Sequence, residues 1–236
     1  MDAQTDKEAF PHHAYRKGAL FGLRPASRQK CLRETDIETA TQNGISIDRF
    51  NGLAAQSDWP VLIDPLCRFT YAKLSAANAL WQCMAGTGLP RRQDMTARLL
   101  QPYIPQLTIY ERLQGPDHIL RFRVRLMGTN SAQFTQEMTG HYIDEILSQE
   151  HLSRWLIAGQ TVLRHGAPLR LLYRGDSFNK KHVVGEAFVA PLLTTDGRPD
   201  LIMAITVFEG GNSWEAIAAR TRRQLAEDEA GQTAPA

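Results

Sequence analysis

Arginine side chains recur at alternate positions in two short segments of the chain. Arg121, Arg123 and Arg125 alternate with apolar residues, and Arg170 and Arg174 do the same in a later segment. Guanidinium groups bind carboxylates and phosphates, so such rows could face an acidic protein partner, a flanking helix or a nucleic acid. Outward charges also prevent sheet edges from adding further strands, and this structural role is the interpretation that we prefer. We keep Arg121, Arg123 and Arg125 as a predicted partner surface.

Composition does not support nucleic-acid binding. The 236 residues carry a net charge of +2 with a pI near 8.5, whereas nucleic-acid-binding domains are typically more basic. No aromatic residues are interleaved with the arginines in the way that single-strand binders show. No apolar run reaches the ~18–20 residues that a membrane helix needs, and the N-terminus has no apolar signal core. We therefore expect a cytoplasmic protein that binds no membrane, with nucleic acid as the least favoured partner.

No motif indicates a catalytic centre. The sequence lacks the GxSxG, HExxH, GxxxxGK and dinucleotide-binding patterns. Glu186 and Glu209 fall in strand patterns, where a lone carboxylate usually points outward. Cys31, Cys67 and Cys83 are far apart and form no CxxC pair, so neither a disulfide framework nor a metal site is expected. The sequence predicts a protein that is not an enzyme.

The segment that begins at Ile119 has the alternation of a half-buried strand. Gly128 interrupts the alternation, and a short helix capped by Asn130 or Ser131 is expected to follow and to end at Thr139-Gly140. Such a strand, helix and pair of glycine breaks would form one wall of a pocket.

The other elements are predicted from period and turn signals. Residues 1–57 are polar and aperiodic, which indicates a flexible N-terminal extension. Asp64 as N-cap and Pro65 at the first helical position predict a helix from Pro65 to Ala85, which would pack on the sheet or on a second subunit. Further elements are expected as follows: strands at Leu107–Arg112, Leu169–Arg174, Val183–Leu193 and Leu201–Phe208, and helices at Leu152–Arg164 and Trp214–Glu229.

The order of these elements predicts an α+β fold. It has a five-stranded antiparallel sheet with short helices on one face, inserted between the second and third strands, and a long N-terminal flanking helix. The run RVRLMGTNSAQFTQEMTGHYIDEIL resembles the signature of a bacterial single-domain branch of the PAS sensor family. The positions that match this family motif are Arg125, Gly128, Thr129, Thr139 and Gly140.

The resemblance covers about Trp81 to Phe208 and implies a division of the chain. Residues 1–57 would be the flexible extension, 58–86 the flanking helix, 87–209 the PAS-like domain and 210–236 a C-terminal helix and tail. In the PAS strand order, the second and third strands lie at opposite edges of the sheet. The two arginine rows would then form two separate strips.

A PAS-like domain would have a ligand pocket lined by the inward-facing side chains of the sheet and of its helices. The same side chains would also make a filled core, which is the alternative that the sequence favours slightly. Haem is not favoured because histidines occur only at the ends of the long helix, at His151 and His165, and flavin is not favoured because no cysteine follows Cys83. No cofactor is assigned. The predicted pocket residues are Phe122, Val124, Leu126, Thr129, Phe134, Tyr142, Trp155 and Tyr173.

These inferences predict a non-enzymatic sensory or regulatory module for signalling. It would bind a small-molecule ligand, a signalling protein partner, or both. Binding would shift the module between two packings of the sheet against its flanking helix. The alternatives are a ligand-free dimerisation or protein-interaction module and a nucleic-acid-associated protein. The resemblance and the long helix favour a homodimer, although such a helix can also fold back on its own sheet.

Overall fold

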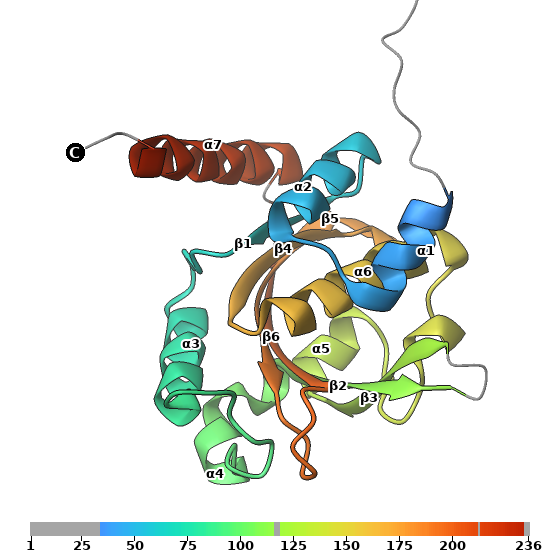
Figure 1. The fold of residues 1–236 in the computed structure, drawn as a ribbon, viewed down its shortest axis with the longest axis vertical. Helices are drawn as coiled ribbons and strands as arrows, with labels where there is room; N and C mark the ends of the chain where they lie inside the picture. Colours follow the sequence, from blue (N-terminus) through green and yellow to red (C-terminus); the bar gives the residue numbers. More distant parts are fainter. Residues whose placement is uncertain (1–33, 116–118, 212, 234–236) are drawn as a thin grey trace, which may run out of the picture. The chain divides into compact units, whose positions relative to one another are not determined.

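The computed structural model describes residues 34–115, 119–211 and 213–233, so the first 33 residues of the expected extension, Cys31 among them, lie outside the described residues. The described chain forms an α+β fold around one six-stranded antiparallel sheet, in the order β1-β4-β5-β6-β2-β3 (Figure 1). The strands are β1 (Val61–Asp64), β2 (Leu107–Gln114), β3 (Leu120–Met127), β4 (Leu169–Gly175), β5 (Lys180–Leu192) and β6 (Leu201–Gly210).

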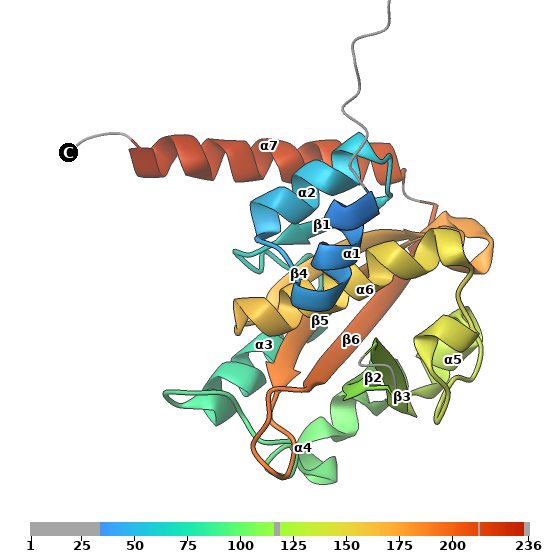
Figure 2. The ribbon, with the colours of Figure 1, turned by 45° about the vertical axis from the view of Figure 1, so that its right-hand side comes forward.

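Helices lie on both sides of this sheet. Helix α6 crosses one face against β5 and β6, with α1 and α2 packed on it (Figure 2). Helix α3 packs on β5 and β6, and α7 packs on β1 and β4. The α-helices are α1 (Glu34–Asn43), α2 (Ile47–Gln56), α3 (Ala72–Ala85), α4 (Ala97–Leu100), α5 (Thr129–Phe134), α6 (Gln149–His165) and α7 (Trp214–Thr233), and the short 3-10 helices are η1 (Gln101–Gln106), η2 (Ile143–Glu145) and η3 (Asp176–Phe178).

The strands predicted from alternation are confirmed as β2 to β6, and the long helix before β4 is confirmed as α6. The short helix expected after Gly128 is also present, but it already ends at Phe134. The five predicted strands follow the order β3-β2-β6-β5-β4 within the sheet. The second and third predicted strands in the chain, β3 and β4, therefore lie at opposite ends of this set of five, which is the arrangement that the resemblance implies.

The expectation of a loosely attached extension is wrong for residues 34–56. Helix α2 buries Phe50, Leu53 and Ala54, whose spacing puts them on one helix face. These side chains belong to the same core cluster as Ile157 of α6. The segment is polar because its outer faces meet water, and its apolar residues are too few to produce a sustained period.

The expected helix from Pro65 is wrong over its first turns, because Asp64 ends a strand. The four residues of β1 are all buried and show no alternation. The carboxylate of Asp64 accepts the backbone N–H of Leu66 at 2.9 Å, which resembles capping, but helix α3 begins only at Ala72. The helix ends at Ala85 as expected.

Strand β1 also overturns the five-stranded sheet and the edge position of β4. It pairs antiparallel with β4, with Leu62 opposite Leu172 and Asp64 opposite Arg170. Arg170 is consequently only 2% exposed. Its guanidinium pairs with Asp64 at 3.4 Å and with Glu186 at 3.1 Å. The second arginine row is therefore not an exposed strip.

A β-bulge changes the face on which one predicted pocket residue lies. In the pairing of β2 with β3, Ile109 is opposite Leu126 and Tyr110 is opposite Val124, which leaves Arg125 as the extra residue. Phe122 and Val124 therefore pack toward α6 in one core cluster, whereas Leu126 packs on the cluster of the opposite face.

Gly128 is fixed by a close backbone approach. A Cβ atom at this position would lie 2.0 Å from the carbonyl oxygen of Ile104, and the Gly128 N–H already bonds to Leu107 at 2.7 Å. We expect Gly128→Ala to lower the free energy of unfolding by at least about 2 kcal/mol, because backbone must move to admit the methyl group. Gly52→Ala in α2 is the control, since nothing lies within 4 Å of its Cβ position. Denaturant melts of both variants measure the difference, and equal stabilities would contradict the explanation.

The buried pairing of Arg170 gives a second expectation for stability. Asp64→Ala would leave Arg170 buried with one carboxylate partner fewer, and we expect a loss of about 3–5 kcal/mol. Asp144→Ala is the matched control, because Asp144 pairs with Arg121 where both side chains are about 30% exposed. The control loss should stay below about 1 kcal/mol. A cost for Asp64→Ala as small as that of the control would show that the buried pair is unimportant.

Candidate ligand-binding site

A cavity of ≈ 150 Å³ lies between α6 and the sheet. This volume is about that of a cavity known to admit benzene. Strands β2, β4, β5 and β6 supply its floor and α6 supplies its roof, while η2, Pro60 and the first residue of β1 close its sides. The main lining residues are Pro60, Val61, Tyr110, Met138, Ile143, Arg154, Trp155, Ala158, Gly159, Val162, Leu171, Tyr173, Ser177, Phe178, Ala187, Val189, Ile202, Ala204 and Thr206.

The alternation of the strands explains the apolar floor. Leu171 and Tyr173 are two positions apart on β4, as are Ala187 and Val189 on β5, so each pair faces α6. The space exists because several lining residues are small. On α6, a Cβ at Gly159 would lie 3.1 Å from the Phe122 ring, so the glycine allows the helix to lie close to β3.

Arginine side chains form the polar end of the cavity. Arg154 of α6 donates from Nη2 to the hydroxyl of Ser177 at 2.8 Å. Burial lowers the pKa of Arg154. Arg174 also lines the cavity, but Asp176 accepts hydrogen bonds from its Nε at 2.6 Å and its Nη2 at 2.9 Å. Within the described residues, Arg154 forms no ion pair.

Two tyrosines lie within the apolar part. The ring of Tyr110 packs edge-on against Trp155 with centroids 5.0 Å apart. Burial raises the pKa of Tyr110 to about 12. Burial also raises the pKa of Tyr173, with a smaller contribution from Tyr110, while a hydrogen bond with Thr206 acts in the opposite direction. The two phenols therefore stay protonated and can offer hydroxyl groups to a ligand.

The sequence-predicted pocket residues are only partly brought together. Trp155 and Tyr173 line the cavity. Phe122 and Val124 are fully buried in the same core, behind the lining. Phe134 does not line the cavity either, because it stacks on Phe208 at 3.7 Å.

Three further predicted pocket residues lie away from the cavity. Leu126 faces the opposite side of the sheet because of the bulge at Arg125. Thr129 is exposed at the first position of α5. Tyr142 lies beside the outer edge of β3, under the guanidinium of Arg121. The centroid of its ring is 3.7 Å from Cζ of Arg121.

Sequence reasoning missed most of the residues that enclose the cavity, Tyr110 and Arg154 among them. The available signal was the alternation of small residues on the inner face of β5 and β6, at Ala187 and Ala204. Small side chains at inward positions of neighbouring strands indicate that space is left for something else. No comparable signal marks Arg154, which looks like any surface arginine on an amphipathic helix.

The family-motif residues support the wall next to the cavity and do not line it. Gly128 allows the close approach to Ile104. Gly140 has a φ of +89°, which glycine adopts without strain, and its N–H donates to Val124 at 2.7 Å. The N–H of Thr139 donates to Glu137 at 2.8 Å. Arg125 is half exposed and pairs with Glu111 at 3.0 Å.

The predicted partner surface is a row of paired charges on the edge strand β3. Arg121 pairs with Asp144 at 2.7 Å and with Glu145 at 3.1 Å. Arg123 pairs with Glu111 at 2.8 Å, and Arg125 shares that carboxylate. The row is therefore close to electrically neutral, which suits edge protection better than phosphate binding.

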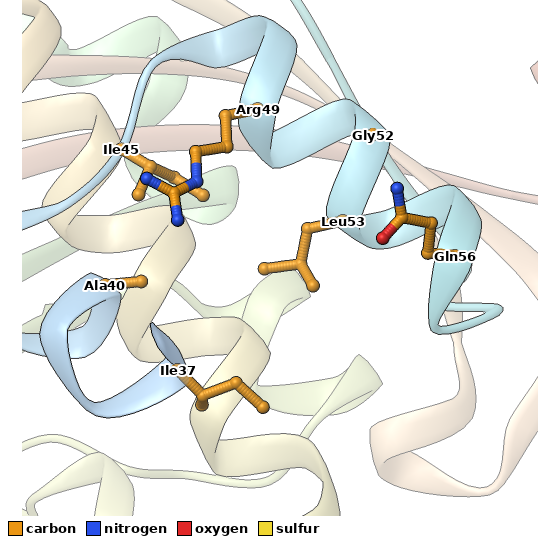
Figure 3. A pocket seen from close by; sticks show the side chains of 7 residues that line it. All are labelled: Ile37, Ala40, Ile45, Arg49, Gly52, Leu53 and Gln56. Carbon is orange, nitrogen blue, oxygen red and sulfur yellow. The ribbon is translucent and has the colours of Figure 1, made fainter. Parts of the chain in front are cut away.

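Other hollows are less suited to a small ligand. A pocket of ≈ 200 Å³ lies between α1 and α2, where Ile37 and Leu53 point toward the gap and Arg49 extends beside Ile45 (Figure 3). Hollows of ≈ 450 and ≈ 400 Å³ flank α7 and have mixed polar and apolar linings. Among the described residues, carboxylates line both of these hollows, with Glu186 and Glu209 in one and Asp228 in the other, whereas none lines the cavity under α6.

Comparisons with known proteins identify no family. No family model matches the sequence, and no curated protein matches it. Among solved structures, an RNA-binding light-oxygen-voltage receptor aligns with 63% of this chain and 43% of its own, at 14% identity and a TM-score of 0.35. A sensory box histidine kinase/response regulator from Burkholderia thailandensis aligns with 56% of this chain and 99% of its own, at 12% identity and a TM-score of 0.32.

A variant of RsLOV aligns with 70% of this chain and 87% of its own, at 18% identity and a TM-score of 0.30. At such identities and TM-scores the likeness carries no argument about function. In the described residues, no helix is long and apolar enough to cross a membrane, and no three His, Cys, Asp or Glu side chains are placed to hold a metal ion.

The pKa of Tyr110 gives a test of the cavity's dryness. Below a pH of about 10 the phenol keeps its proton in both the folded and the unfolded state. Between pH 10 and about 12 only the unfolded state loses it, so this residue lowers stability as the pH rises through that window. The tyrosinate absorbance is titrated in the wild type and in Tyr110→Phe, and the difference between the two curves belongs to Tyr110. This difference should appear only near pH 12. A component that titrates near pH 10 would show that water reaches the ring.

Proposed function

We propose that this chain is a non-enzymatic sensory or regulatory module of the PAS type that binds a small apolar ligand under α6. The observation that carries the proposal is the cavity itself, ≈ 150 Å³ in volume and lined by residues of five strands and of α6. Folded interiors are normally packed without voids of this size. A largely apolar space with a few polar groups at one end is the usual form of a small-molecule site.

The strand order supports the PAS assignment. Within the set β2 to β6, strands β3 and β4 lie at opposite ends, as the motif resemblance implies, and the helical segments α5, η2 and α6 fall between them in the chain. The added strand β1 and the helices α1 and α2 lie outside this set of five strands and their inserted helices. We treat them as the part of the chain that responds to the site.

A physical route joins the cavity to α1 and α2. Helix α6 forms the roof of the cavity and contacts both α1 and α2 on its other side. The backbone of Gly44, between those two helices, lies so close to Gln160 of α6 that a Cβ would come within 2.7 Å. Suppose that α6 can take two positions relative to the sheet and that the ligand binds the protein more tightly in one of them. The ligand would then favour that position of α6, and α1 and α2 would move with the helix.

A ligand-free interaction module is the second candidate. Strand β3 is a sheet edge, and Arg125 keeps 52% of its side chain exposed there. A signalling partner, or a second copy of the chain in a homodimer, could bind over the side chains of this strand, whose backbone at Val124 is already bonded to Gly140 and His141. Binding to this edge would not require an empty cavity, so the two candidates can be separated by filling it.

The test uses a cavity-filling substitution on a helix. Ala158→Leu puts a larger side chain into the cavity from α6, and Ala219→Leu makes the same change at an exposed position of α7. We expect benzene to raise the melting temperature of the wild type and of Ala219→Leu, because a ligand that binds only the folded state stabilises it. Ala158→Leu should fold but lose the shift. Absence of a shift in the wild type would refute the ligand site and leave the interaction module.

A further inference from the structure

We propose that the ligand is a small monocarboxylic acid whose apolar body is about the size of a benzene ring, and that Arg154 binds its carboxylate. This inference rests on the proposed function and names the ligand class for the same site. It depends on the charges at the polar end of the cavity, on the unused hydrogen-bond donors of Arg154 and on the direction in which the lining changes from polar to apolar.

Arg154 has donors to spare, whereas its neighbour does not. A guanidinium offers five N–H donors in a planar fork. Among the described residues, Arg154 uses Nη2 for the hydroxyl of Ser177 at 2.8 Å. Arg174 is held by both carboxylate oxygens of Asp176 and by Glu215 at 3.4 Å. Because Asp176 is engaged in this way, Arg154 is the cavity-lining cation that remains available to an anion.

Partial burial makes an anionic partner favourable. Burial disfavours the charged form of Arg154 and lowers its pKa, while the carboxylates of Asp176 and Glu150 act in the opposite direction from outside the lining. These two carboxylates offset only part of the cost of burying Arg154, because the net shift of its pKa is downward. A carboxylate can supply two parallel hydrogen bonds to the guanidinium, which is the strong geometry for this pair.

The lining sets the orientation of such a ligand. Arg154, Ala158 and Val162 are four residues apart and so lie along one face of α6, about 12 Å from first to last. The polar group is therefore at the N-terminal end of this face and the apolar side chains follow it. No acidic side chain lines the cavity in the described residues, so a carboxylate meets no like charge, whereas a cationic ligand would face two arginines.

The experiment compares ligands of one shape and three charges. Benzoate, benzyl alcohol and benzylamine are titrated calorimetrically into the full chain, with isovalerate as a second, non-aromatic acid. The wild type should bind benzoate at least about tenfold more tightly than benzyl alcohol, which corresponds to one charge-assisted hydrogen bond. Benzylamine should bind most weakly.

Substitutions at Arg154 then assign the selectivity. Arg154→Gln should lose at least about tenfold in benzoate affinity and leave benzyl alcohol within about twofold, because only the anion uses the guanidinium. Arg154→Lys keeps the charge without the fork and should fall between the wild type and Arg154→Gln. Arg164→Gln is the matched control, since Arg164 lies on the same helix, is exposed and does not line the cavity.

The outcomes separate the two proposals. Equal affinity for benzoate and benzyl alcohol, unchanged in Arg154→Gln, would overturn the carboxylate inference while the ligand site stands. A loss of benzoate binding in Arg164→Gln as large as that in Arg154→Gln would also overturn it, because the effect would then be one of net charge. Failure of every probe, benzene included, would overturn the ligand site and the carboxylate inference together.

Discussion

Arg170 lies inside the fold between Asp64 and Glu186, and the position of β1 depends on this pairing. Asp64 is the last residue of β1 and is fully buried, so the strand can join the sheet only where its carboxylate meets a cation. Once β1 lies beside β4, its first residue, Val61, and the preceding Pro60 reach the side of the cavity. The chain before β1 forms α2, which packs on α6, and the chain after β1 forms α3 on the opposite face of the sheet. The buried ion pair therefore contributes to the enclosure of the proposed site.

The cavity under α6 follows from the size of the residues that meet there. Alanines at inward positions of β5 and β6, together with Ala158 and Gly159 of α6, leave space that the aromatic residues around them do not fill. One end of this space carries Arg154 and Ser177, joined by a hydrogen bond. A site with an apolar body and one cationic end can select both the shape and the charge of a ligand.

The sequence predicted the parts of the fold that have a period. Strands β2 to β6 and helix α6 were predictable because their apolar residues recur at two or at about four positions. Strand β1 was not, because a strand buried on both faces has no alternation and Asp64-Pro65 looks like the start of a helix. The site was predicted less well: Trp155 and Tyr173 line it, but the bulge at Arg125 moved Leu126 to the other face.

The most direct test of the ligand site is native mass spectrometry of the protein purified from the cells that produce it. The spectrum is compared with that of the same sample after denaturation and with that of Ala158→Leu, whose added side chain occupies the cavity. We expect an excess mass on the folded wild type that is lost on denaturation and is absent from the variant. A bare polypeptide mass for the folded wild type, or an excess mass that Ala158→Leu retains, would contradict a ligand held under α6.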